Sequence, residues 1–66
     1  MLIPKIEGST VKIIDGTTGI VRRVIHCSAY KDPKSFEIQG DHIAIACGDG
    51  KCRLFDLKNG ILKRTF

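Results

Sequence analysis

The sequence predicts an all-β protein made of antiparallel sheets, and three observations support this fold class. No segment carries apolar residues at i, i+3, i+4 and i+7 over a useful length, as an amphipathic helix would. Short apolar runs instead alternate with turn signals such as Gly48-Asp49-Gly50. Residues 11–25 also return as residues 52–66, with Asp15 repeated at Asp56 (56 − 15 = 41). A fixed period of this size indicates a repeat architecture.

Three strands are predicted in the first repeat. They are expected at residues 2–6, 11–15 and 20–25, with turns at residues 8–9 and 16–19. Pro4 lies inside the leading strand and has no N–H to donate to a neighbouring strand. This strand is therefore expected at a sheet edge or in an irregular conformation.

The second repeat contains a run of four predicted strands. Residues 35–39 alternate polar and apolar side chains, and residues 43–47 are continuously apolar, as in a buried strand. Further strands are expected at 51–57 and 61–66, and a loop at 26–34 precedes the repeat. The chain is thus interpreted as one small domain, residues 1–66, with a first repeat at 2–25 and a second at 35–66.

The composition is typical of an ordinary folded protein, and the cysteine count favours the cytoplasm. The three cysteines, an odd number, accompany no secretory signal, which favours reduced thiols over a disulfide framework. No apolar stretch approaches the roughly 18 residues of a membrane span. The net charge of +4 gives mild attraction toward anionic partners and is not a strong nucleic-acid signature. We therefore expect a soluble cytoplasmic protein without membrane contact.

The second repeat resembles part of a WD-repeat β-propeller blade. Residues 44–60, AIACGDGKCRLFDLKNG, are similar to the hairpin of its second and third strands. Asp49 matches the turn between these strands, Asp56 matches the Asp of the Trp-Asp signature, and Gly60 matches the turn into the outer strand. The 41-residue period agrees with this family as well.

The resemblance covers nearly the whole chain but departs from the family in its signature residues. It implies that residues 35–39 are the inner strand of one blade and that residues 2–25 are three strands of the preceding, incomplete blade. The signature Trp is Ile14 in the first repeat and Phe55 in the second, and no Gly-His dipeptide precedes the inner strand. His26 matches only approximately, so the family's buried Asp-His-Ser-Trp network is not implied.

Two architectures are consistent with these patterns. The sheets form either about two WD-like propeller blades or a small barrel or sandwich that retains the blade hairpins. A propeller ring takes four or more blades, and this chain supplies fewer than two. Because exposed strand edges and apolar faces seek partners, we expect homo-oligomerisation.

The cysteines and histidines are interpreted as structural residues, so no metal and no cofactor is expected. Cys47 and Cys52 flank a turn and face each other if they pair across the hairpin, where a soft metal site would also draw on His26, Cys27 or His42. Their spacing is poor for zinc, which usually pairs cysteines two to four residues apart. Small apolar cysteines in strands are more typical of a core.

The sequence predicts a protein that is not an enzyme. Asp15 and Asp56 are equivalent carboxylates, and this repetition favours turn capping over a catalytic pair. Gly48-Asp49-Gly50 lacks the strand-to-helix context of a phosphate-binding loop. No nucleophile with an adjacent base is present in the pattern.

The leading functional hypothesis is a non-enzymatic binding or scaffold module of WD-like repeats that presents loops to a protein partner. Its predicted contact residues lie in two loops and are Tyr30, Lys31, Lys34, Asp49 and Lys51. The alternative is a small basic β-protein that binds RNA or DNA through a rim of Lys and Arg. That rim comprises Arg22, Arg23, Lys51, Arg53, Lys63 and Arg64.

Overall fold

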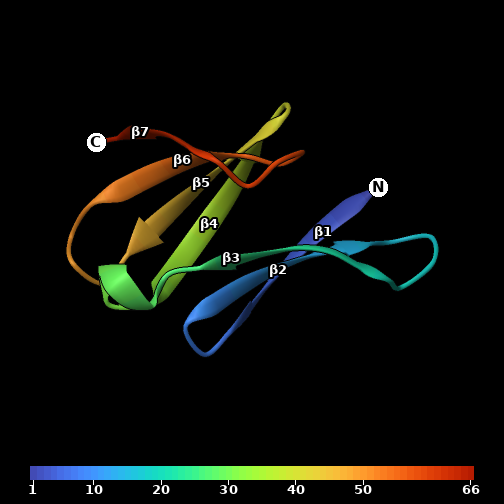
Figure 1. Ribbon diagram of the computed structural model, residues 1–66, viewed down its shortest axis with the longest axis horizontal. Coiled ribbons are helices and arrows are strands. Elements are labelled where there is room, and N and C mark those ends of the chain that lie inside the picture. Colours follow the sequence, from blue (N-terminus) through green and yellow to red (C-terminus); the bar gives the residue numbers. More distant parts are fainter.

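The computed structural model describes residues 1–66 and confirms an all-β protein of two antiparallel sheets (Figure 1). The first sheet contains β1 (Leu2–Glu7), β2 (Thr10–Asp15) and β3 (Val21–His26) in that order. The second contains β4 (Pro33–Gln39), β5 (His42–Cys47), β6 (Cys52–Asp56) and β7 (Leu62–Thr65). A single 3₁₀ turn, Ser28–Tyr30, lies between the sheets and is far too short to cross a membrane.

The seven strands follow the predicted order, and their ends differ from the prediction by a residue or two. The loop predicted at residues 26–34 is shorter, because His26 ends β3 and Pro33 begins β4. Pro33 is buried and pairs with Cys47 just before an irregularity in the register. A proline is tolerated there because the first residue of a strand need not donate to the ladder.

β1 is an edge strand, as Pro4 predicts. It pairs only with β2, and Pro4 lies opposite Ile13. The other edge of β1 has no partner strand in its own sheet, whereas the corresponding edge of β5 is covered by β4. The first sheet thus has one strand fewer than the second.

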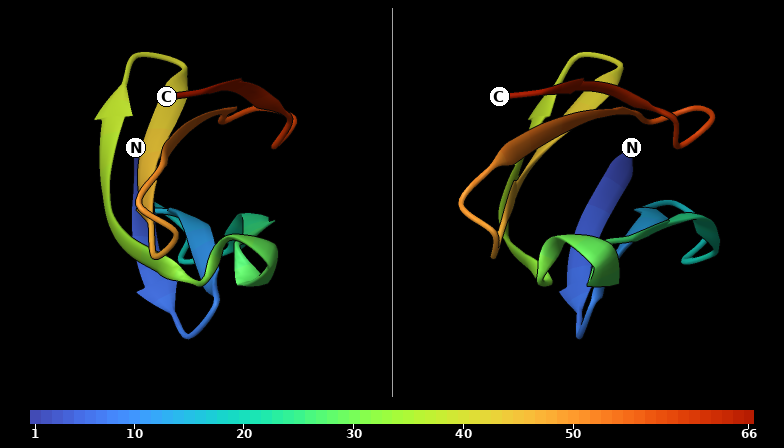
Figure 2. Two further views of the ribbon diagram at one scale, coloured as in Figure 1. Left: turned by 90° about the vertical axis from the view of Figure 1, so that its left-hand side faces the viewer. Right: turned by 60° about the vertical axis from the view of Figure 1, so that its left-hand side comes forward.

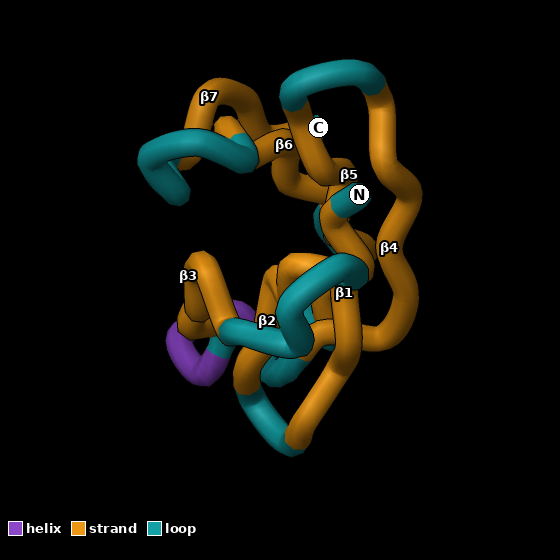
Figure 3. Tube along the Cα trace, turned by 90° about the vertical axis from the view of Figure 1, so that its right-hand side faces the viewer, coloured by secondary structure: helices purple, strands orange, loops and turns teal.

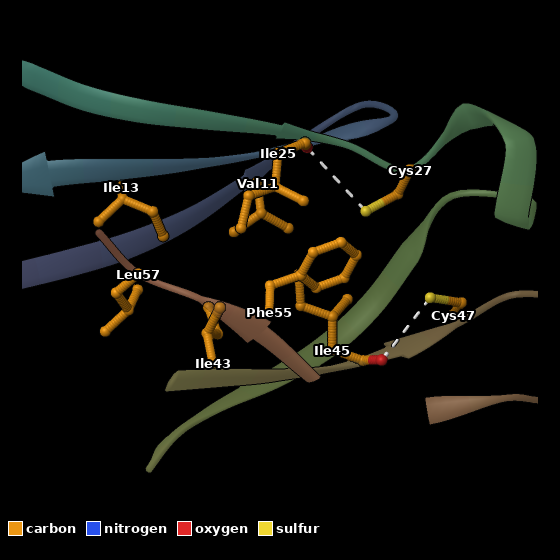
Figure 4. Packing of buried hydrophobic residues seen from close by; sticks show 9 residues of the cluster. All are labelled: Val11, Ile13, Ile25, Cys27, Ile43, Ile45, Cys47, Phe55 and Leu57. Carbon is orange, nitrogen blue, oxygen red and sulfur yellow. Dashed lines mark hydrogen bonds between the residues drawn. The ribbon is translucent and has the colours of Figure 1, made fainter. Parts of the chain in front are cut away.

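The core lies between the two sheets (Figure 4). The first sheet contributes Val11, Ile13 and Ile25, and the second contributes Ile43, Ile45, Phe55 and Leu57, while Cys27 and Cys47 extend the cluster at one end. Val11, Ile13, Ile43 and Ile45 have no solvent-exposed surface. Burial of these branched side chains between the layers is the main source of stability in a chain that has no disulfide.

The two layers are not parallel slabs. In the right-hand view of Figure 2 most of the first sheet, in blue to green, lies to one side of the second, in yellow-green to red. β1 and β4 are the strands at which the two sheets come closest in the backbone, and Figure 3 shows β3 and β7 splayed apart on the opposite side. The molecule is therefore a wedge that is narrow along β1 and β4 and wide along β3 and β7.

The sequence repeat is also a structural repeat. β2 and β3 pair with Lys12 opposite Val24, and β6 and β7 pair in the same way at positions 41 residues later, Arg53 opposite Thr65. Both pairs carry a register shift at the equivalent place, between Ile13 and Ile14 and between Leu54 and Phe55.

The turns that follow β2 and β6 are built alike. The Asp15 carboxylate accepts bonds from the backbone N–H groups of Thr17 and Thr18 at 2.8 and 3.3 Å. The Asp56 carboxylate accepts from residues 58 and 59 at 2.7 and 3.3 Å. The predicted turn-capping role of Asp15 and Asp56 is confirmed, and these bonds to the ionised form hold the pKa of both carboxyls below the ordinary range.

Candidate interaction surface

Two loops that carry the predicted contact residues lie together at one end of the molecule. The backbone N–H of Asp49 donates to the carbonyl oxygen of Tyr30 at 3.1 Å, and that of Gly48 donates to the carbonyl of Asp32 at 2.8 Å. The connection between the sheets is thus hydrogen-bonded to the β5–β6 turn. Tyr30, Lys31, Asp49 and Lys51 form what we call the Tyr30 surface.

The 3₁₀ turn presents Tyr30 through backbone bonds centred on Cys27. The carbonyl oxygen of Cys27 accepts from the N–H groups of Tyr30 and Asp32 at 3.0 and 3.1 Å. Lys31 and Asp32 then adopt left-handed conformations with φ of 61° and 66°. Such conformations are uncommon for residues other than glycine and persist where surrounding contacts hold them.

The β5–β6 turn approaches this connection closely. A Cβ on Gly48 would overlap the carbonyl oxygen of Lys31, so only glycine fits at this position. The turn itself is closed by a bond from the Cys47 N–H to the Lys51 carbonyl at 2.9 Å. The Asp49 carboxylate accepts from the Lys51 N–H at 3.1 Å.

Arg53 joins the two loops from beneath. Its guanidinium donates to both carboxylate oxygens of Asp49, at 3.1 Å to Oδ1 and 2.7 Å to Oδ2, and lies 3.8 Å from the centre of the Tyr30 ring. The Arg53 residue is only 8% exposed. A bidentate ion pair covered by an aromatic ring is a rigid arrangement, which fixes the positions of Tyr30 and Asp49 together.

The pKa values of three groups at this end of the molecule are shifted, those of Asp49 and Arg53 by their ion pair and that of Cys27 by burial. Hydrogen bonds from Arg53 lower the pKa of Asp49 to about 2, and the same contact raises the pKa of the arginine. Burial, reinforced by the neighbouring Cys47, raises the pKa of Cys27 to about 11. Cys27 is therefore a neutral thiol at physiological pH, which makes it a poor nucleophile.

The stability of the fold should fall in acid partly because of Asp49. Its folded pKa is lowered, so the stabilisation is present above the ordinary pKa near 3.8 and is lost as the pH falls toward 2. The expected result is that Asp49→Asn is less stable than the unmodified chain at about pH 6, and that the difference narrows by about pH 3.

Urea denaturation at the two pH values measures this effect. Glu7→Gln is the comparison variant: Lys12 also lowers the pKa of Glu7, but at an exposed site, so the same pH dependence is expected with a smaller amplitude. An Asp49→Asn curve that parallels the unmodified protein across the pH range contradicts the role given to the Asp49–Arg53 pair.

Lys34 is the remaining predicted contact residue, and Arg53 has a role at this surface that the sequence did not predict. Lys34 is exposed near the start of β4, next to the Tyr30 surface in sequence. Arg53 was not predicted to support the contact residues, although it was placed in the basic rim. Its alternation with Phe55 and Leu57 could have shown that it lies on the buried face of β6.

The basic residues of the alternative hypothesis are not all free to contact a nucleic acid. Arg53 is engaged by Asp49, and Arg23 donates from its guanidinium to the carbonyl oxygen of Lys58 in the other sheet. Arg22 is largely exposed and lies 3.8 Å from an oxygen of Asp15. The others, Lys51, Lys63 and Arg64, are exposed.

The cysteines flanking the β5–β6 turn do not face each other. Ala46, not Cys47, lies opposite Cys52 in the register, so the two cysteines project to opposite faces of the sheet. Cys47 is buried in the core with Cys27, and Cys52 is half-buried. The two histidines belong to different sheets, with His42 at the start of β5 and His26 at the end of β3.

The structure shows neither a pocket nor a cluster of three or more side chains suited to a metal ion. Comparisons with protein-family models, with curated proteins and with solved structures yield no match. Functional inference therefore depends on the geometry of this chain.

Proposed function

We propose that the protein is a non-enzymatic binding or scaffold module of WD-like repeats, which assembles with other copies of itself and presents the Tyr30 surface to a protein partner. The observation that carries this proposal is the rigid junction of the two loops through Arg53. Aromatic and arginine side chains in ordered, partly buried positions are typical of the residues that dominate binding energy in protein interfaces.

Self-assembly is supported by the amount of apolar surface left on the chain. Large apolar side chains remain exposed on both sheets, and they include Leu2, Ile3, Ile20, Val21, Phe36, Ile38, Ile61, Leu62 and Phe66. A chain of this length buries too little surface to be more than marginally stable alone. Association with further copies covers such surface and raises stability.

The solution mass tests this proposal most directly. Light scattering at micromolar concentration is expected to give a weight-average mass of at least about twice the chain mass, and this mass should fall on dilution. A compact protein that stays monomeric at every concentration would overturn the assembly part of the proposal.

Nucleic-acid binding remains the second candidate, because Arg22 and Lys63 are exposed at equivalent places on β3 and β7. Assembly would repeat these charges around the particle. Binding of a random oligonucleotide that weakens steeply with added salt distinguishes this function from protein binding, since the slope counts the phosphates contacted.

A further inference from the structure

The two faces of each sheet are distinguished by the strand register. Side chains directly opposite each other in an antiparallel pair share a face. In the first sheet Ile13 lies opposite Pro4, and in the second sheet its equivalent, Leu54, lies opposite Ala44. We call the side that carries Ile13 or Leu54 face A and the other side face B. Equivalent residues are 41 positions apart on β2 and β6 but 40 positions apart on β1 and β5 (44 − 4 = 40). The difference arises because the β5–β6 turn is one residue longer than the β1–β2 turn.

The core pairs unlike faces. The first sheet contributes Val11, Ile13 and Ile25 from its face A, and the second contributes Ile43, Ile45 and Phe55 from its face B (Figure 4). The two sheets are therefore stacked in the same sense and not as mirror partners. Because face A of the first sheet packs on face B of the second, face B of the first sheet and face A of the second remain free.

Both free faces carry apolar residues beside charged ones: Lys5, Lys12 and Glu7 share face B of the first sheet, and Glu37, opposite Ala44, shares face A of the second. Face B of the first sheet carries Ile3, Ile14, Val21 and Val24. Face A of the second sheet carries Ala44, Ala46, Cys52 and Leu54. Ile3 and Val21 are each 45% exposed. These are the same two kinds of face that meet inside the chain, so the free pair continues an interface that the chain already contains.

We propose that copies of this chain bind head to tail, with face A of the second sheet of one copy packed on face B of the first sheet of the next. This inference rests on the self-assembly proposed above and specifies its interface. We assign a second copy to each free face, because the core already packs one face A on one face B in the same sense.

A polar contact inside the chain has an unused equivalent at the proposed junction. Arg23, on face A, donates to the Lys58 carbonyl, and a Cβ on Gly60 would lie 3.0 Å from its Cδ. In the repeat, Arg64 is the equivalent of Arg23 (23 + 41 = 64). Thr17 and Gly19 are the equivalents of Lys58 and Gly60 (58 − 41 = 17, 60 − 41 = 19).

Gly19 has φ of 78°, close to the 72° of Gly60, but open space beside it. The Arg64 guanidinium should therefore donate to the Thr17 carbonyl of the next copy and cover its Gly19. Phe66, which is 65% exposed, is the equivalent of buried Ile25 and should become buried at the same junction.

Complementation between two variants tests the head-to-tail arrangement. Ala44→Glu places a charge on face A of the second sheet and leaves face B intact, whereas Ile3→Glu does the reverse. In sedimentation experiments each variant alone should be monomeric, and an equimolar mixture should give a dimer through the two intact faces. Far-UV circular dichroism checks that both variants remain folded.

Arg64→Ala tests the polar contact, with Lys63→Ala as its control on the same strand with the same change in charge. Loss of a hydrogen bond from a charged donor should raise the dissociation constant at least about tenfold for Arg64→Ala. Lys63→Ala should assemble like the unmodified chain. Ala44→Glu and Ile3→Glu could impair folding, because each places a charge among apolar side chains. Arg64→Ala should not, because Arg64 lies on the surface and the substitution adds no charge.

The outcomes separate this inference from the proposed function. Assembly by the unmodified chain that persists in Ala44→Glu alone, in Ile3→Glu alone, or undiminished in Arg64→Ala overturns the head-to-tail interface and leaves self-assembly standing. A monomeric unmodified chain overturns both. Monomeric variants that form a dimer only when mixed support the inference, since neither an A-to-A nor a B-to-B contact predicts that result.

Discussion

Replacing Ile45 by alanine is expected to leave much of the protein unfolded at room temperature. Ile45 is fully buried between the two sheets. Truncation of such a side chain costs about 2–5 kcal/mol, through lost transfer free energy and the cavity that remains. A domain of this length rarely has more than about 3–5 kcal/mol of stability. The loss therefore consumes most or all of the free energy of unfolding.

Urea denaturation followed by circular dichroism measures this loss, with a stabilising osmolyte added so that a folded baseline exists. Ile61→Ala is the matched control, because Ile61 is the same residue type but 56% exposed, and it should cost well under about 1 kcal/mol. Equal denaturation midpoints for the two variants would show that the core is not centred between the sheets.

The second large effect is expected for Gly48→Ala. The new methyl group would overlap the Lys31 carbonyl, so the connection and the β5–β6 turn must separate. That movement strains or breaks the bonds from the Gly48 and Asp49 N–H groups. We expect a loss of about 2–4 kcal/mol in the free energy of unfolding, from overpacking and lost hydrogen bonds together.

Gly40→Ala separates this close approach from simple backbone strain. Gly40 has φ of 61° and open space beside it, so its substitution should cost about 1 kcal/mol from the left-handed conformation alone. Hydrogen exchange should also show faster exchange of the Asp49 amide in Gly48→Ala than in Gly40→Ala. Equal effects in the two variants would contradict the close approach described above.

Much of the fold was predictable because its strands are short and are separated by strong turn residues. The apolar run at residues 43–47 and the repeated Asp and Gly around Asp15 and Asp56 were sufficient to predict hairpins and their capped turns. The 3₁₀ turn at Ser28–Tyr30 was not predicted, because three residues carry no periodic signal. The start of β4 at Pro33 was missed, since Asp32-Pro33 has the composition of a turn.

The candidate site was only partly predictable. Sequence placed Tyr30 and Asp49 in separate loops, and nothing in the sequence indicated that their backbones are hydrogen-bonded to each other. The position of Cys47 relative to Cys52 was also open, because it depends on the number of residues in the intervening turn. Register, which one added residue reverses, decides the face on which each side chain lies.

The unequal spacing of the two sheets has a consequence for the size of any assembly. Because β1 and β4 approach each other while β3 and β7 diverge, each sheet is rotated relative to the one before it. Copies added by the same contact repeat that rotation and follow an arc. The angle of the wedge, more than the strength of the contact, then sets whether the arc closes after a fixed number of chains or winds into an open spiral.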